Sequence, residues 1–238
     1  MLHLYLRLCS FNIMIGIILV TPLSISIYLM VPKANNFSFT IIVMVIGFGL
    51  CNLMMSLSRF LGRKATSSCF PELMPAQQML MPTDTTLDPI TKKRYYEFFS
   101  SNLKNLSFYE EPKTSANSCK TAINWLIAQT RDEEKFPLIK EEAINFGFSK
   151  NLYGLKYLGI FTSSFLTILE VVAIVAKYNH QIGCVEYSNL IASAIVSFTF
   201  TIVWIFLITK EWVIYSGNRY ARTLLSACDS ELLSIHQE

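Results

Sequence analysis

Four apolar stretches of about 20 residues each, arranged as two close pairs on either side of a polar segment, constrain the fold of this chain most strongly. They cover residues 13–31, 39–58, 157–176 and 190–208. A helix needs about 20 residues to cross a hydrocarbon core about 30 Å thick, so each stretch has the length of one crossing. Lipid requires the backbone hydrogen bonds to be made within the helices. The sequence therefore predicts an all-α polytopic membrane protein with two transmembrane helical hairpins.

The positions of the cations predict the orientation of these hairpins. Only 16% of the 238 residues are charged, against about 25% in a typical soluble domain. Lys33 and Lys177 lie in the short hairpin loops, and many other cations flank the opposite ends of the stretches: Arg7, Arg59, Arg63, Lys64, Lys150, Lys156, Lys210, Arg219 and Arg222. Positively charged flanks remain on the cytoplasmic side of a membrane. Both termini and the central segment are therefore expected in the cytoplasm.

Four regions follow from this pattern. We expect a first transmembrane hairpin at 1–60, a small helical cytoplasmic sensing domain at 61–156, a second hairpin at 157–210 and a cytoplasmic C-terminal tail at 211–238. Within the central domain, Asp88 followed by Pro89 is a strong helix start, because Asp caps the first turn and Pro fits the first helical position. Further helices are expected over 116–131 and after Pro137, and the residues from 62 to 81 are expected to be irregular because of their Pro residues.

The sequence offers no catalytic or metal-binding motif. Its six cysteines are scattered singly, without a C-x-x-C pair, and its three histidines are far apart in the chain. Neither a Walker-type loop nor a nucleophile elbow occurs. We therefore expect no enzyme activity, no metal and no cofactor. Cys184, at an outer hairpin tip, is the one cysteine expected outside the cytoplasm and the membrane.

Polar side chains recur at helical spacing inside three of the apolar stretches. The candidate pore-lining residues are Asn52, Ser163, Thr167, Glu170, Ser193, Ser197 and Thr201. Glu170 is the only ionisable residue well inside any stretch, and an intramembrane carboxylate usually faces a bundle interior or a water path. Stripes of Ser, Thr and Gly are also the ordinary packing faces of membrane helices. Pore lining and helix packing both remain open.

A cluster of cations and aromatic residues marks the central domain. It consists of Lys92, Lys93, Arg94, Tyr95 and Tyr96. Cations that contact phosphates and aromatic rings that stack on bases are the elements of single-stranded nucleic-acid binding. However, residues 59–156 contain 14 basic and 11 acidic residues, a net charge of only +3. A solvated helix face is therefore the simpler interpretation of the same cluster.

The central region also resembles a family of bacterial four-span membrane proteins. The similarity is carried by LDPITKKRY at 87–95, FPLI at 136–139 and NFGFSKNLYGLK at 145–156. In architecture the chain is similar to the membrane effector of the Hailong anti-phage system, an oligomeric ion channel with a cytoplasmic crown domain. In that system a partner nucleotidyltransferase makes single-stranded oligodeoxyadenylate, which binds the crown and holds the channel closed. The resemblance implies a homo-oligomer in the bacterial inner membrane with a single-stranded DNA ligand.

Two classes of function remain. The first is a regulated channel effector embedded in the lipid bilayer, with the cluster from Lys92 to Tyr96 binding the nucleic-acid ligand. The second is a non-conducting membrane scaffold whose cytoplasmic domain docks a protein partner. Secondary transport fits less well, because four spans without broken-helix signals leave little room for a midplane site.

Overall fold

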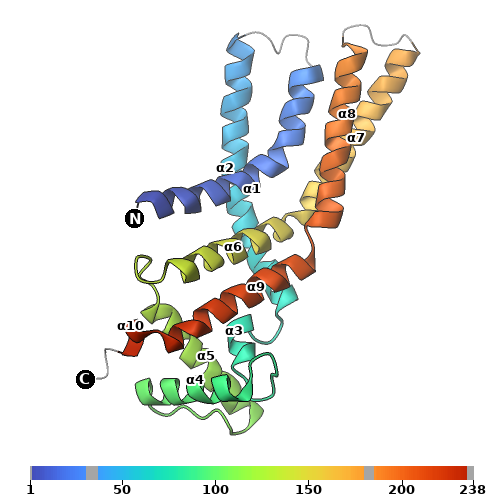
Figure 1. Cartoon of the computed structure of the whole chain (residues 1–238). Coiled ribbons are helices and arrows are strands. Elements are labelled where there is room, and N and C mark those ends of the chain that lie inside the picture. The colour runs from blue at the N-terminus through green and yellow to red at the C-terminus, as the bar shows by residue number, and fades with distance from the viewer. Residues whose placement is uncertain (1, 31–36, 180–184, 235–238) are drawn as a thin grey trace. The chain divides into compact units, whose positions relative to one another are not determined.

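A computed structural model describes residues 2–30, 37–179 and 185–234, and all regular structure within these ranges is helical (Figure 1). The expectation of an all-α chain is confirmed for this part. Cys184 lies outside the described residues. The chain divides into two compact units. The span unit comprises residues 2–65 and 148–210, and the aromatic-core unit comprises residues 66–147 and the helices from Glu211 onward.

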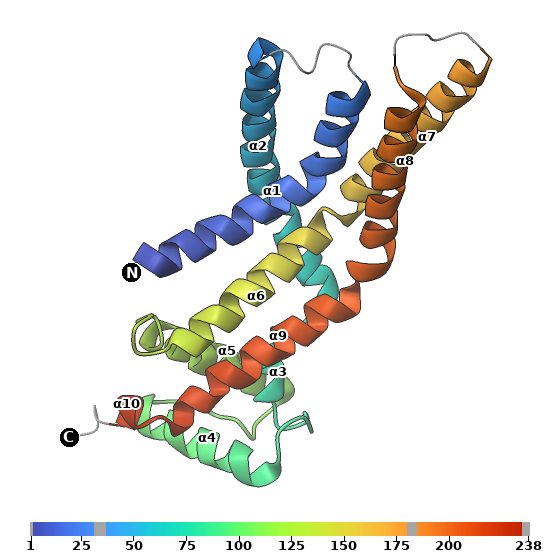
Figure 2. The ribbon, with the colours of Figure 1, turned by 45° about the horizontal axis from the view of Figure 1, so that its top comes forward.

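The span unit contains the apolar helices. These are α1 (Leu2–Met30), α2 (Phe37–Cys69, of which residues 66–69 belong to the other unit), the end of α6 (Pro137–Gly154), α7 (Lys156–Tyr178) and α8 (Tyr187–Ile202), which continues into a π-helical turn, η1 (Val203–Leu207). Helices α7 and α8 lie side by side in both ribbon views (Figures 1 and 2). Pro22 lies inside α1, where it cannot donate a backbone hydrogen bond to Ile18, and Figure 1 shows α1 bent.

Three helical segments are long and apolar enough to cross a membrane. They are Met44–Cys69, Lys156–Tyr178 and Tyr187–Leu207, and Ile13–Leu29 is a shorter apolar segment. These helices agree with a membrane protein. The fourth span, the two-hairpin topology and the sides of the termini remain predictions.

The structure corrects the expected end of the second apolar helix. The Pro residues predict an irregular segment at 62–81, yet α2 continues to Cys69 and a short α3 occupies Pro75–Met79. No proline interrupts the chain between the start of α2 and Pro71, so the helix continues until Phe70, whose following proline disfavours the α conformation.

The aromatic-core unit packs helices around buried aromatic rings. It contains α3, α4 (Pro89–Asn102), α5 (Pro112–Gln129), the start of α6, α9 (Lys210–Leu225), the 3-10 turn η2 (Ser226–Asp229) and α10 (Glu231–Ser234). The start predicted at Asp88 is confirmed, because its carboxylate accepts a hydrogen bond from the Thr91 N–H at 2.8 Å. Helix α9 lies along the first half of α6 (Figures 1 and 2), with the Tyr220 and Phe146 rings stacked 6.1 Å apart. The segment described as a tail in the sequence analysis therefore supplies part of this core.

Candidate intramembrane polar site

Close packing of α7 against α8 and η1 holds together the helices that carry the candidate site. Gly159 of α7 lies against the indole ring of Trp204, which is fully buried in η1, and a Cβ atom on Gly159 would overlap that ring. Only glycine permits this approach without a shift of one helix. A π-helical turn adds one residue per turn and often marks a functional position, and here it places Trp204 toward α7.

Glu170 of α7 is the centre of the site. Its side chain is 0% exposed. Its Oε1 atom accepts hydrogen bonds from Ser26 at 2.5 Å, from Ser197 at 3.1 Å and from Ser193. Three hydroxyls from two other helices, α1 and α8, therefore converge on one carboxylate oxygen. The second oxygen, Oε2, is buried and has no hydrogen-bond partner among the residues that the structure describes.

Further hydroxyl contacts extend this cluster along α8. The Ser193 and Ser26 hydroxyl oxygens lie 3.0 Å apart, and the Thr201 hydroxyl donates to the Ser163 hydroxyl at 3.0 Å. Successive fourth residues of a helix are about 6 Å apart along its axis, so the polar contacts from Ser193 to Thr201 cover about 12 Å. We call Ser26, Ser163, Glu170, Ser193, Ser197 and Thr201 the polar track.

The structure brings together five of the seven predicted pore-lining residues. Thr167 instead donates to the Ser163 carbonyl of its own helix at 2.9 Å. Asn52 is exposed on α2 and donates to the Phe48 carbonyl at 2.9 Å. Ser26 was not predicted, because the first apolar stretch shows no repeated polar stripe that would single it out.

Glu170 has hydroxyl partners but no ion-pair partner among the described residues. No Lys or Arg forms an ion pair with Glu170 in the part of the chain that the structure describes. An ionised carboxylate inside an apolar bundle is costly unless it is paired. The hydroxyl groups stabilise a charge on Oε1 but do not neutralise it. A proton or a small cation can supply the missing charge.

The predicted nucleic-acid residues lie in the other unit, and most of them are engaged within it. The Lys92 ammonium donates to the carbonyl oxygens of Met81 at 2.8 Å and Asp84 at 2.5 Å, and its side chain is buried. The Tyr96 hydroxyl donates to the Leu80 carbonyl at 2.6 Å, and burial raises the pKa of Tyr96. These two side chains hold α4 against the segment that follows α3.

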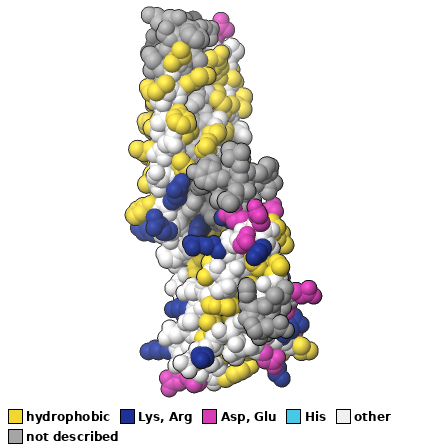
Figure 3. Space-filling model, turned by 90° about the vertical axis from the view of Figure 1, so that its left-hand side faces the viewer, with side chains coloured by type: hydrophobic (Ala, Val, Ile, Leu, Met, Phe, Trp, Pro, Cys, Tyr) yellow, Lys and Arg dark blue, Asp and Glu magenta, His cyan; other side chains and the backbone are white. Residues whose placement is uncertain are grey.

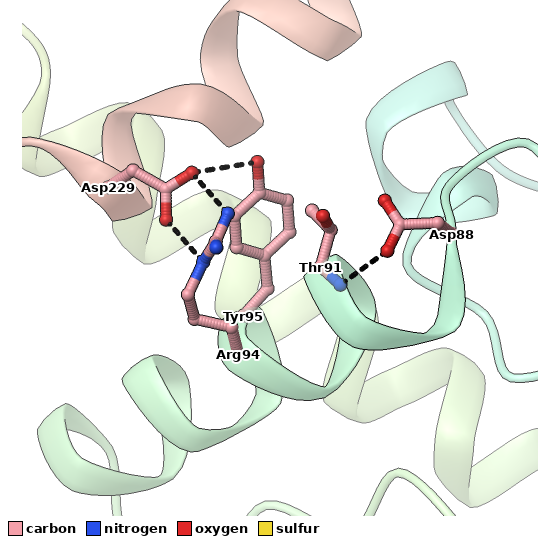
Figure 4. Close-up of polar contacts among 5 residues, drawn as sticks. All are labelled: Asp88, Thr91, Arg94, Tyr95 and Asp229. Atoms are coloured by element: carbon pink, nitrogen blue, oxygen red, sulfur yellow. Dashed lines mark hydrogen bonds and ion pairs between the residues drawn. The ribbon is translucent and has the colours of Figure 1, made fainter.

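Arg94 and Tyr95 connect α4 to the end of η2 (Figure 4). The Arg94 guanidinium binds both carboxylate oxygens of Asp229, at 2.7 and 2.9 Å. Tyr95 donates to the same carboxylate at 3.4 Å, and burial followed by the charge of Asp229 raises the pKa of Tyr95 to about 12. Lys93 is highly exposed, with its ammonium 3.9 Å from the Glu97 carboxylate. The geometry thus leaves Lys93 as the best placed of the five for an external phosphate.

Comparison of the chain with protein-family models, with curated proteins and with solved structures finds no match.

Proposed function

We propose that the protein is a membrane ion channel that passes small cations along the polar track, with four spans in two hairpins. The observation that supports this proposal is Glu170, a fully buried carboxylate with three hydroxyl donors on one oxygen and, among the described residues, no partner on the other. Helix packing alone does not require an ionisable group there, because a serine or an alanine fills such an interface at lower cost.

A carboxylate such as that of Glu170 beside an ion path favours cations over anions. Glu170 is the only acidic residue within the three candidate spans. Carboxylates favour cation entry in channels, and hydroxyl oxygens can replace part of an ion's hydration shell. The track is closed in this conformation, so conduction requires α7 and α8 to separate from α1 or from each other. A channel that conducts only after such a movement of its helices is a gated channel.

Ion flux into protein-containing lipid vesicles tests the proposal. Glu170→Gln keeps the shape of the side chain and removes its charge. We expect cation flux to fall by about tenfold or more, which corresponds to about 1.4 kcal/mol on the barrier. Glu186→Gln is the matched control, because Glu186 is the only other acidic residue of the span unit and is exposed. If a folded Glu170→Gln variant conducts like the parent protein, Glu170 has only a packing role.

For regulation, we propose that the channel is a homo-oligomeric anti-phage effector. As the resemblance implies, bound oligodeoxyadenylate would hold it closed. Binding of oligodeoxyadenylate to the purified protein, measured at two concentrations of salt, tests it. Each neutralised phosphate contributes a log–log slope of roughly −0.7 for a single strand. We expect Lys93→Gln to reduce the slope, whereas Lys92→Gln should act by loosening α4. Salt-independent binding, or no binding, would remove the nucleic-acid ligand from the proposal.

A non-conducting scaffold is the second candidate. The complete burial of Glu170 within one chain favours it, because a closed hydroxyl cluster also ties three helices together. Parent vesicles without any cation flux, in the presence and absence of oligodeoxyadenylate, would support the scaffold.

Labelling of introduced cysteines tests the cytoplasmic location of the aromatic-core unit. Cys69, Cys119 and Cys228 are buried, so none of them reports on the side of the membrane. Cys184→Ser first removes the cysteine that is expected at an outer hairpin tip. In that background Ile90→Cys places a thiol at an exposed position, which should resist an impermeant reagent in intact cells and react after lysis. Reaction in intact cells would reverse the orientation.

A further inference from the structure

The serine hydroxyls around Glu170 crowd onto one of its two carboxylate oxygens. Ser26, Ser193 and Ser197 all lie within hydrogen-bond distance of Oε1, and the Ser26 and Ser193 oxygens are 3.0 Å from each other. A carboxylate has about four lone-pair sites, shared between its two oxygens. Three donors on Oε1 therefore exceed the sites of that atom, while Oε2 is buried without a hydrogen-bond partner among the described residues. Hydrogen bonding alone does not account for this arrangement.

The same atoms form a cluster of oxygen ligands. Each serine hydroxyl has one proton and two lone pairs, so it can donate to Glu170 and still present a lone pair to an ion. Three hydroxyl oxygens and the carboxylate thus converge from α1, α7 and α8, and oxygen ligands are the ones that hard cations prefer. In the described part of the chain, no group of three or more His, Cys, Asp or Glu side chains is placed to hold a metal ion. The ligand set of the cluster therefore suits an alkali cation better than a transition metal.

The surroundings of the cluster are apolar. Glu170 is 0% exposed, and the three serines are at least nine-tenths buried. Outside them, α7 and α8 expose hydrophobic side chains such as Val172 and Ile195. The upper part of the surface in Figure 3 likewise carries hydrophobic side chains and few charged ones. An ionised carboxylate is stable in such surroundings only with a cation beside it, because apolar side chains and lipid do not compensate its charge.

Charge and spacing select the kind of cation. One carboxylate balances one monovalent cation, whereas a divalent cation would leave a net positive charge in apolar surroundings. The oxygen atoms are closely spaced, at 3.0 Å between Ser26 and Ser193 and 3.1 Å between Ser197 and Glu170. The size of a site and the number of its ligands decide which ion fits, and closely spaced oxygens suit a small ion. Sodium meets both conditions better than potassium or calcium does.

We infer that Glu170, Ser26, Ser193 and Ser197 bind one sodium ion in the closed protein. The ion is coordinated by the hydroxyl oxygens and the carboxylate, and it thereby ties α1 to α7 and α8. It supplies the positive charge that no Lys or Arg among the described residues provides to Glu170. The inference rests on the site of the proposed function and names its ion, but binding by the closed protein does not require conduction.

Binding of radioactive sodium to the full-length protein, purified in detergent, tests this inference. We expect the parent protein to bind a single ion per chain, and unlabelled sodium to displace it at a lower concentration than potassium does. Glu170→Gln removes the charge and should weaken binding by about tenfold or more. Ser193→Ala removes one hydroxyl oxygen and should weaken it by about three- to tenfold. A parent protein that binds no sodium, or binds potassium more tightly, would overturn the inference.

Two further variants make the result specific. Thr201→Val removes a hydroxyl of the polar track that contacts Ser163 rather than Glu170, so this variant should bind sodium as the parent protein does. Glu170→Asp keeps the charge on a shorter side chain and should bind sodium more tightly than Glu170→Gln, which separates lost charge from lost folding. Equal binding by the parent protein and by Glu170→Gln would contradict the assignment.

Thermal unfolding distinguishes a sodium ion from a proton on Glu170. At constant ionic strength, replacement of choline by sodium at about 30 times its dissociation constant should raise the Tm of the parent protein by about 4–8 °C and leave that of Glu170→Gln unchanged. A parent Tm that does not depend on sodium would mean that a proton neutralises the carboxylate, and the inference would fail.

Comparison with cation flux into vesicles separates this inference from the proposed function. Sodium binding by a parent protein that shows no flux would uphold the ion site and reject the channel in favour of the scaffold. Flux through a parent protein that binds no sodium when closed would uphold the channel and reject the bound ion.

Discussion

The two units of the chain bury opposite kinds of side chain. In the span unit, large hydrophobic residues such as Phe161 and Val172 are exposed, while Glu170, Ser163, Ser193 and Ser197 are fully buried. In the aromatic-core unit the buried side chains are mainly hydrophobic, with Phe99, Leu80 and Leu126 fully enclosed. This difference is expected if lipid surrounds the first unit and water the second. Burial therefore marks polar contacts between helices in the span unit and the hydrophobic core in the aromatic-core unit.

Glu170 and Lys92 illustrate this point as two buried ionisable side chains. The Lys92 ammonium has two carbonyl acceptors, which fix the segment after α3 to α4, so its burial has a structural explanation. Glu170 has donors on one oxygen and, within the described ranges, none on the other, so its carboxylate is incompletely satisfied. Buried polar groups are normally hydrogen-bonded, and an exception calls for a functional explanation. We therefore base the proposed function on Glu170 and assign Lys92 a structural role.

The largest expected effect compares one phenylalanine from each unit. Phe99→Ala should destabilise the aromatic-core unit by about 3–5 kcal/mol, because the ring is fully buried among other side chains. Phe161→Ala should lower the stability of the span unit by less than about 1 kcal/mol in lipid, because that ring is exposed. Hydrogen exchange of the amides in α4 and α7 measures both. Equal losses would mean that Phe161 packs against protein.

The second prediction concerns alkaline pH. Burial raises the pKa of Cys119 from 9.0 to about 11, so the folded state holds the thiol proton more tightly than the unfolded state. The resulting stabilisation is complete below pH 9.0 and is lost as the pH rises from there to about 11. It amounts to about 2–3 kcal/mol at most. Urea unfolding on either side of the lower pKa, at about pH 8.5 and about pH 10.5, should therefore show a smaller alkaline loss for Cys119→Ala than for the parent protein. Equal losses would contradict the prediction.

The third prediction separates two neighbouring lysines of α4. Lys92→Met leaves the carbonyls of Met81 and Asp84 without their donor, which should cost about 1–3 kcal/mol. Lys93→Met affects an exposed side chain and should change stability by less than about 0.5 kcal/mol. Urea unfolding of both variants at neutral pH checks this. A larger loss for Lys93→Met would give Lys93 a structural role and remove it as the preferred phosphate contact.

Local sequence signals predicted the starts of α4 and α6, whereas α5 covers Pro112–Gln129 and begins four residues before the expected 116. Asp88 and Pro89 define a cap and a first turn within a few residues, so no distant contact is needed to recognise them. The end of α2 was missed because Ser- and Pro-rich composition suggested a loop, although the prolines come only after the helix has ended. Contributions from distant segments were also missed. The packing of α9 on α6 depends on residues far apart in the chain, such as Phe146 and Tyr220.

The candidate site was predictable only where its residues repeat along one helix. Ser193, Ser197 and Thr201 share one face of α8, and that face was recognised. Ser26 could not be identified, because its role depends on how α1 packs against α8. In α4, Lys92 belongs to the same face as Tyr95, Tyr96 and Phe99, which marks it as part of a buried stripe. The cluster from Lys92 to Tyr96 was interpreted by residue type, as cations and aromatic rings that could bind nucleic acid. The helical spacing of Lys92, Tyr95 and Tyr96 predicts their burial and was the better guide.

The smallest expected effect concerns Asn52, which lies in the same unit as the polar track but outside it. Its amide donates to the Phe48 carbonyl of its own helix, and its side chain is exposed on α2. Asn52→Leu should therefore leave cation flux into vesicles within about twofold of the parent value, whereas Glu170→Gln should lower it by about tenfold. Thr167→Val is a useful companion, because Thr167 also bonds its own helix and should behave like Asn52→Leu. A tenfold loss of flux in Asn52→Leu would place α2 along the ion path. Conduction would then run between subunits rather than along the track within one chain, because the hydrogen bonds that the structure describes around Glu170 come from α1 and α8.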